Sequence, residues 1–200
     1  MVNGRRKGAH AELQVVRQSE FWWRKLPLDQ QVTPDGAQCQ FVRTPQSGGW
    51  STNRVRGSFR VAGDLSSTSD SWPFTVEVKR RESWSLSVFI MGGKRGSPVW
   101  GWWQQCVKSA NEEGGVPMLW MRRSQQPWIV LLPETIAVPR LGVRRADIYW
   151  EDPDIVAAHN TSGVHPIGYL ASKVTDTDPG AWLGLRRALA PNPADLPPGV

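Results

Sequence analysis

Three residues with catalytic potential, Asp64, Glu77 and Lys79, lie within one short stretch of the sequence. Residues 74–79 alternate apolar and polar side chains, which predicts a strand with Glu77 and Lys79 on one face, because strand side chains repeat every two residues. Asp64 lies near the end of a second alternating segment, 55–65. If the two strands are neighbours, both carboxylates and the amine meet at one point.

Two carboxylates that converge repel each other unless a cation lies between them. Oxygen ligands favour Mg²⁺ or Mn²⁺, which also bind phosphate oxygens and lower the pKa of a bound water. Lys79 could orient or deprotonate that water, or hold the scissile phosphate. The pattern therefore indicates a phosphodiesterase. The same residues also fit a solvated strand face with a weak Glu–Lys pair, and that alternative stays open.

The charge of the chain points to a polyanionic partner. The 200 residues carry a net charge of +6. Residues 1–133 hold 18 basic and 10 acidic side chains, a net charge of +8, whereas residues 134–200 hold 6 and 8, a net charge of −2. A basic body suggests nucleic acid, although a basic protein without such a partner has the same composition. The 12 tryptophans fill a core or stack on nucleobases.

Periodicity and turn residues predict one mixed α/β domain over residues 1–133. A C-terminal extension of unknown role, 134–200, would add a short strand near 136–138 and a short helix at 181–189, with about the last ten residues disordered. Residues 3–8 are expected to form a flexible basic arm, and residues 92–98 a glycine-rich loop. The elements expected in the domain are helix 9–25, strands 39–44, 55–65 and 74–79, helix 99–113, and a hairpin of strands 117–122 and 128–133.

The cellular compartment is expected to be the cytoplasm, or the host-cell cytoplasm if a phage encodes the chain. No apolar run approaches the length of a membrane span, and no secretory signal is expected at the N-terminus. Cys39 and Cys106 lie far apart in the sequence, which disfavours a disulfide framework or a thiolate zinc site.

Four motifs in order resemble the PD-(D/E)xK nuclease superfamily and, more narrowly, the archaeal-type Holliday junction resolvases and their phage-encoded relatives. Lys7-Gly8 with Glu12 is similar to the family's opening Lys-Gly-x-x-x-Glu on the first helix. Residues 43–49 resemble its Arg-x-x-x-Ser-Gly-Gly turn. Gly63-Asp64 stands for the metal-binding Asp, with Gly63 in place of the usual Pro, and residues 76–79 for the Glu-x-Lys strand. The interval between the turn and Asp64 is long, and the chain after residue 133 matches nothing in this pattern.

The resemblance implies a restriction-endonuclease-like core, a central mixed β-sheet flanked by helices, with a role for each matched residue. Asp64, Glu77 and the Val78 carbonyl would bind Mg²⁺ or Mn²⁺, and Glu12 would bind it directly or through water. Lys79 would position the nucleophilic water, and Ser47 would contact the scissile phosphate or the neighbouring backbone. Gln104, at the start of the next helix, resembles a Gln that would orient water or Lys79. The candidate phosphate contacts are Arg5, Arg6, Lys7, Arg43, Arg54, Arg80, Arg81, Lys94 and Arg95.

The expected function is metal-dependent cleavage of branched DNA, in particular the four-way (Holliday) junction, by a homodimer that presents two active sites to two strands. Two alternatives stay open. One is another nuclease of the superfamily, of the nicking, repair or restriction type. The other is a non-catalytic DNA-binding module whose acidic residues are surface features.

Overall fold

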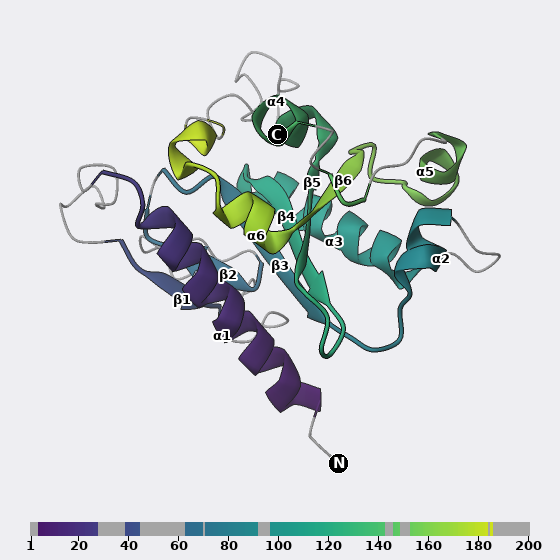
Figure 1. Ribbon diagram of the computed structural model, residues 1–200, viewed down its shortest axis with the longest axis horizontal. Helices are drawn as coiled ribbons and strands as arrows, with labels where there is room; N and C mark the ends of the chain where they lie inside the picture. The colour runs from purple at the N-terminus through teal and green to yellow at the C-terminus, as the bar shows by residue number, and fades with distance from the viewer. Residues whose placement is uncertain are drawn as a thin grey trace, which may run out of the picture.

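A computed structural model describes residues 4–27, 39–44, 63–69, 71–91, 97–142, 146–148, 153–183 and 185, with backbone alone for residues 4–7 and 153. Within these ranges the chain forms one mixed six-stranded sheet flanked by helices (Figure 1). The predicted α/β class and the restriction-endonuclease-like core are confirmed.

The strands stand in the sheet in the order in which they occur in the chain, β1 to β6. All neighbouring strands are antiparallel except β3 and β4, which are parallel and are connected through helix α3. Parallel neighbours need such a crossover, whereas antiparallel ones can be joined by a hairpin. The strands are β1 (Phe41–Arg43), β2 (Leu65–Ser67), β3 (Phe74–Arg80), β4 (Val116–Arg122), β5 (Ile129–Pro133) and β6 (Pro166–Leu170).

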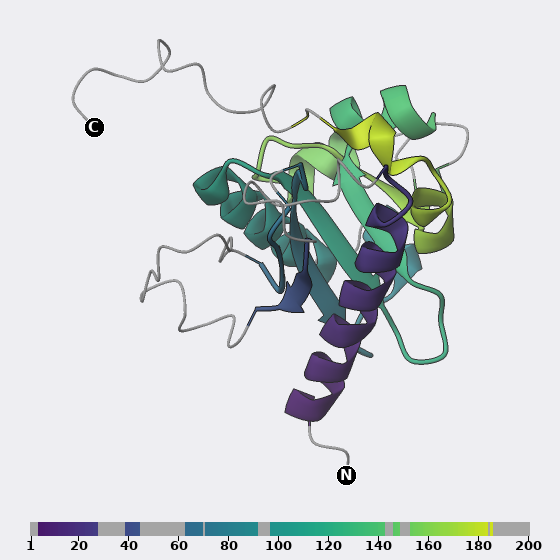
Figure 2. The ribbon, with the colours of Figure 1, turned by 90° about the vertical axis from the view of Figure 1, so that its left-hand side faces the viewer.

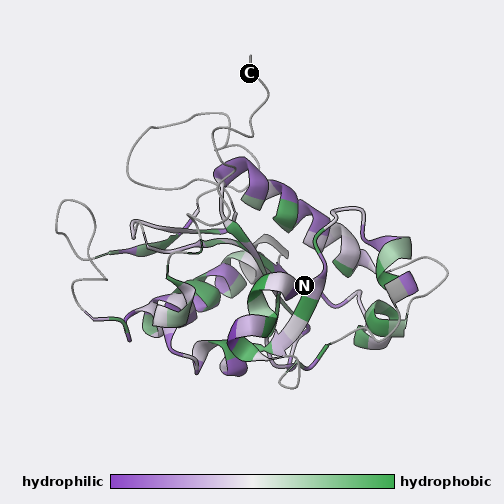
Figure 3. Cartoon of the chain, turned by 90° about the horizontal axis from the view of Figure 1, so that it is seen from above, coloured by the Kyte–Doolittle hydropathy of each residue, from purple (hydrophilic) through white to green (hydrophobic). Residues whose placement is uncertain are grey.

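The helices cover both faces of the sheet. Helix α1 lies on one face and α3 on the other, as the side view shows (Figure 2). Hydrophilic and hydrophobic residues alternate around these helices, as expected of elements with one buried side (Figure 3). The helices are α1 (Gly4–Trp23), α2 (Leu86–Met91), α3 (Pro98–Glu113), α4 (Glu134–Leu141), α5 (Pro153–His159), α6 (Ala171–Thr175) and the 3₁₀ turn η3 (Pro179–Trp182). No described helix is long and apolar enough to cross a bilayer.

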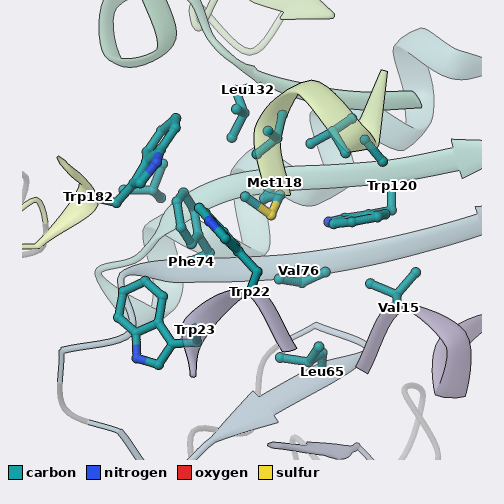
Figure 4. Close-up of a cluster of buried hydrophobic side chains, with 14 of the residues drawn as sticks. Val15, Trp22, Trp23, Leu65, Phe74, Val76, Met118, Trp120, Leu132 and Trp182 are labelled. Atoms are coloured by element: carbon teal, nitrogen blue, oxygen red, sulfur yellow. The ribbon is translucent and has the colours of Figure 1, made fainter. Parts of the chain in front are cut away.

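A tryptophan-rich core fills the space between α1 and the sheet. The ring of Trp22 lies about 6 Å from those of Trp23, Phe74 and Trp182 (Figure 4). The Trp22 indole donates to the carbonyl of Thr177 at 3.0 Å. A second core lies between α3 and the other face of the sheet, where Trp103 donates to the Val164 carbonyl at 2.8 Å. The tryptophans of both cores serve packing, and hydrogen bonds pair the buried N–H groups of Trp22 and Trp103.

Residues after 133 complete the same sheet and core. Strand β6 pairs along the whole of β5, from Ile129↔Leu170 to Pro133↔Pro166. Trp182, from η3, is fully buried beside Phe74 of β3. The extension therefore covers one edge of the sheet and supplies a large core side chain.

Most predicted elements before residue 133 are confirmed, but the strand expected at 55–65 is not, since Asp64 precedes β2, which begins at Leu65. Several other predictions are also wrong. The predicted helix 9–25 is α1, which begins earlier, at Gly4, so the expected flexible arm 3–8 is wrong from that residue onward. The strand expected near 136–138 is wrong, since Ile136 and Val138 lie in α4. Of the helix expected at 181–189, the described part shows the 3₁₀ turn ending at Trp182 and a helical Leu185. Residues 55–62 and 92–96 and the last ten residues lie outside the described ranges.

Candidate active site

Asp64 is fixed by backbone hydrogen bonds at the start of β2. Its N–H donates to the Val76 carbonyl at 2.7 Å, and its carbonyl accepts from the N–H of Thr44 at 3.1 Å. The carboxylate accepts from the N–H of Val78 at 2.8 Å and is only 5% exposed. Gly63 allows this approach, because its φ of +84° suits glycine and a Cβ there would overlap the Val76 carbonyl oxygen. The backbone of β3 therefore sets the position of Asp64.

Glu77 and Lys79 share the face of β3 that is turned toward α3, while Val76 and Val78 join the core under α1. The Lys79 ammonium donates to the Glu77 carboxylate at 2.8 Å. Glu77 is 4% exposed, whereas Lys79 is half-buried. The side-chain alternation predicted for residues 74–79 is confirmed, and the alternative of a solvated strand face is excluded for Glu77.

Burial raises the pKa of Glu77, and the adjacent charge and hydrogen-bonding contact of Asp64 raise it further, against the opposing effect of Lys79. Burial by itself would lower the pKa of Lys79. The neighbouring carboxylates of Glu77 and Asp64 outweigh it, so the pKa of Lys79 is raised. Lys79 is therefore held as a cation, and Glu77 takes up a proton more readily than an exposed glutamate does.

Glu12 approaches the cluster from α1. Its carboxylate pairs with Arg43 of β1 at 3.2 Å. Burial raises the pKa of Glu12, Asp64 adds to the rise, and Arg43 and Lys79 oppose it. Glu12 is thus electrostatically coupled to Asp64 and Lys79, but its hydrogen bond is to Arg43.

The donor set fits a hard divalent cation in its chemistry. Asp64 and Glu77 are two almost fully buried carboxylates, and the charge of Asp64 raises the pKa of Glu77, an arrangement that a proton or a cation would stabilise. As the side chains stand, no group of three or more His, Cys, Asp and Glu residues within the described ranges is close enough to hold a metal. The pair formed by Asp64 and Glu77 is therefore the centre on which a metal would bind.

Of the remaining predicted residues, Gln104 lies differently from the expectation, and the expectation for Val78 is not tested. Gln104 donates to the carbonyl of His159 at 3.0 Å, so the structure does not bring it to Lys79. The reason is helical geometry, since Gln104 is about 160° around α3 from Cys106, which faces β3 and is buried there. Val78 reaches Asp64 through its N–H, and a role for its carbonyl stays a prediction.

The predicted phosphate contacts are described only in part. Arg43 is engaged by Glu12, Arg80 donates to the Ser124 hydroxyl at 3.4 Å, and Arg81 is exposed just after β3. The side chains of six predicted contacts and of one predicted catalytic residue lie outside what the structure describes. The six contacts are Arg5, Arg6, Lys7, Arg54, Lys94 and Arg95, and the catalytic residue is Ser47.

Arg122 is a basic residue at the end of β4 that sequence reasoning missed. It ends β4 directly beside Arg80, which ends β3. The Arg-Arg pairs at 80–81 and 122–123 are visible in the sequence, but their adjacency depends on the parallel pairing of β3 with β4. A matched pair of basic dipeptides at the ends of two predicted strands is the signal that could have found it.

The fold and the site together define a restriction-endonuclease-like α/β protein with an acidic pair and a lysine on adjoining strands. Residues 3–153 match the model of a family described as "Phage putative PDDEXK endonuclease". Since this match covers more than half of the chain, the protein belongs to that PD-(D/E)xK endonuclease family. No curated protein and no solved structure matches the chain.

Proposed function

We propose that this protein is a divalent-metal-dependent DNA endonuclease that cuts four-way junctions. The observation that carries the nuclease proposal is the buried cluster of Asp64, Glu77 and Lys79 on β2 and β3. Membership of a PD-(D/E)xK endonuclease family supports the same reaction class.

Asp64 and Glu77 would hold Mg²⁺ or Mn²⁺, with Glu12 near enough to act through water. When bound, such an ion supplies Lewis acidity and lowers the pKa of water. The chain's own part is to hold both carboxylates in place before the ion arrives. The Val78 N–H does this for Asp64, and β3 does it for Glu77.

Lys79 would act as a cationic donor rather than as a base. The carboxylates beside it raise its pKa, so it keeps its proton at neutral pH. An ammonium group at this point can donate to a non-bridging oxygen of the scissile phosphate or orient the attacking water. The proton of that water would then leave to a group other than Lys79.

Two observations support branched DNA as the substrate. The basic body, with its net charge of +8 over residues 1–133, favours a densely charged polyanion. The order of the Lys-Gly…Glu, Ser-Gly-Gly, Asp and Glu-x-Lys motifs resembles that of junction resolvases. A homodimer would place two such centres on symmetry-related strands of a junction.

The test is cleavage of a labelled four-way junction beside a flap and a linear duplex, each with and without Mg²⁺. We expect the wild type to nick the junction in pairs only with metal. Glu77→Gln and Asp64→Asn should lower cleavage at least a hundredfold and leave junction binding within about threefold. Glu112→Gln, a change of an exposed glutamate on α3, is the matched control and should cleave normally.

The other outcomes identify the alternatives. Cleavage of the duplex or flap in preference to the junction would leave a PD-(D/E)xK nuclease of another type. Binding without metal-dependent cleavage of any substrate would leave a DNA-binding module. Mass measurement by light scattering, with and without the junction, tests the homodimer.

A further inference from the structure

Two arginines lie side by side at the carboxyl ends of β3 and β4, the two central strands of the sheet. The parallel register of β3 and β4 pairs Arg80 with Arg122, and the N–H of Arg81 donates to the Arg122 carbonyl at 3.3 Å. Arg80 directly follows Lys79 along β3, so its side chain stands on the α1 face while that of Lys79 stands on the α3 face. The β4–β5 turn, which follows Arg122, lies at the same end of the molecule as the start of α1 (Figures 1 and 2).

Neutral groups hold Arg122 in place. Its guanidinium donates to the side-chain oxygen of Gln14 on α1 at 2.9 Å. The guanidinium carbon lies 4.6 Å from the ring centroid of Trp128, in cation–π geometry. These contacts fix the orientation of the Arg122 guanidinium group but do not compensate its positive charge.

Arg80 is held in the same way, by the hydroxyl of Ser124 at 3.4 Å. Ser124 in turn donates to the carboxylate of Glu82. Across the described residues, no carboxylate forms an ion pair with Arg80 or Arg122. The Nε atoms of both side chains are buried and lack a hydrogen-bond partner.

Adjacent, half-buried guanidinium groups without a counter-charge repel each other. The pKa of Arg122 is lowered, first by burial and then by the charge of Arg80. An anion with several oxygen acceptors removes this repulsion and fills the free donors, and a phosphodiester matches the arginine fork better than a single carboxylate does.

We propose that Arg80 and Arg122 together bind a backbone phosphate of the bound DNA. This inference rests on the proposed function for the identity of the polyanion. It assigns Arg122 a role in binding, and it makes Gln14 and Trp128 positioning residues, which orient Arg122 and do not touch DNA.

The test measures binding in the absence of divalent metal, so that cleavage plays no part. The dissociation constant of a labelled four-way junction is measured at several NaCl concentrations for the wild type, Arg80→Gln, Arg122→Gln and Arg122→Lys. Lys108→Gln is the control, because it removes one charge from an exposed position on α3.

We expect each Arg→Gln variant to weaken binding about tenfold near 0.1 M salt and to lower the slope of log K against log[salt] by about one. Arg122→Lys should keep the slope, and Lys108→Gln should match the wild type. The phosphate site is overturned if both Arg→Gln variants bind with the affinity and slope of Lys108→Gln.

Two further measurements separate this site from folding and from catalysis. Thermal unfolding reports whether Arg122→Gln still folds. If Arg122→Gln does not fold, Arg80→Gln tests the site, because this change removes only one long hydrogen bond. Normal cleavage by Arg80→Gln and Arg122→Gln with unchanged binding would remove the phosphate site and leave the nuclease. If the wild type does not cleave and both variants lose binding, the nuclease proposal fails and the phosphate site stands.

Discussion

Glu77 combines deep burial with an acidic neighbour, and this makes it a source of instability as well as a candidate ligand. A carboxyl whose pKa is raised in the folded state binds a proton there more readily than in the unfolded chain. Between its ordinary pKa of 4.5 and the higher folded value, the stability therefore falls as the pH rises. At pH values above the pKa of Glu77 in the folded state, the full loss of stability remains.

We expect the metal-free protein to lose stability as the pH rises from about 4.5 toward the raised pKa of Glu77 in the folded state, by at most about 1.4 kcal/mol per pH unit for this group. Glu77→Gln should reduce that slope and raise the stability at pH 7.5, while the raised pKa of Glu12 keeps part of the slope. Urea unfolding across this pH range measures the effect. Identical profiles for wild type and variant would contradict it.

Mg²⁺ should compensate the negative charge of the buried Glu77 and Asp64 carboxylates. We expect millimolar Mg²⁺ to raise the unfolding temperature of the wild type at pH 7.5, because an ion that binds only the folded state stabilises it. The increase should disappear in Asp64→Asn and Glu77→Gln and persist in the surface control Glu112→Gln. An equal increase in all four proteins would indicate a general salt effect.

At the scale of elements, the β2–β3 pair depends on Gly63. We expect Gly63→Ala to cost well over the ~1–2 kcal/mol that a left-handed residue with a side chain costs, because its Cβ would also overlap the Val76 carbonyl. The shift of the strand would move Asp64 and abolish cleavage. Chemical unfolding and the junction assay measure the two effects.

Gly114→Ala is the matched control for this change. Gly114 also has a positive φ, +65°, but a Cβ there meets nothing within 4 Å, and the residue caps α3. It should cost about 1–2 kcal/mol and leave cleavage intact. Equal losses in both variants would show that Gly63 has no special part in placing Asp64.

Local patterns predicted the elements that carry Glu77 and Lys79. The two-residue alternation of β3 and the glycine pair 114–115 that ends the helix predicted at 99–113 are short-range signals, and both elements are confirmed. The prediction that Asp64 lies beside Glu77 and Lys79 depended on the pairing of two strands, which the sequence alone does not determine. The orientation of Gln104 away from β3 required knowing which side of α3 meets the sheet.

The elements after residue 133 were harder to predict because packing decides them. Strand β6 contains Pro166 and Gly168, two residue types that are uncommon in strands and therefore weaken the strand signal in the sequence. Gly168 is nevertheless needed, because a Cβ there would lie 2.8 Å from the Ile148 side chain. Helix α4 contains Pro139, and its apolar run 136–138 is too short to distinguish helix from strand.

At the scale of the whole molecule, Trp182 ties the C-terminal part to the core. It is fully buried and lies 6.0 Å from Trp22 and 5.4 Å from Phe74. We expect Trp182→Ala to lower the free energy of unfolding by about 3–5 kcal/mol. Phe21→Ala, which removes an aromatic ring that is 73% exposed, should cost less than about 1 kcal/mol. Similar losses measured by urea unfolding would contradict the role of Trp182.

The hydrogen bond from Trp22 to Thr177 joins residues that are 155 positions apart. During synthesis the first helix leaves the ribosome long before this acceptor exists, and it must wait for the rest of the sheet to emerge. Contacts that span so much chain slow the search for the native state. We therefore expect a nascent chain to complete this core only after Thr177 has emerged from the ribosome, and purified protein to refold slowly from denaturant.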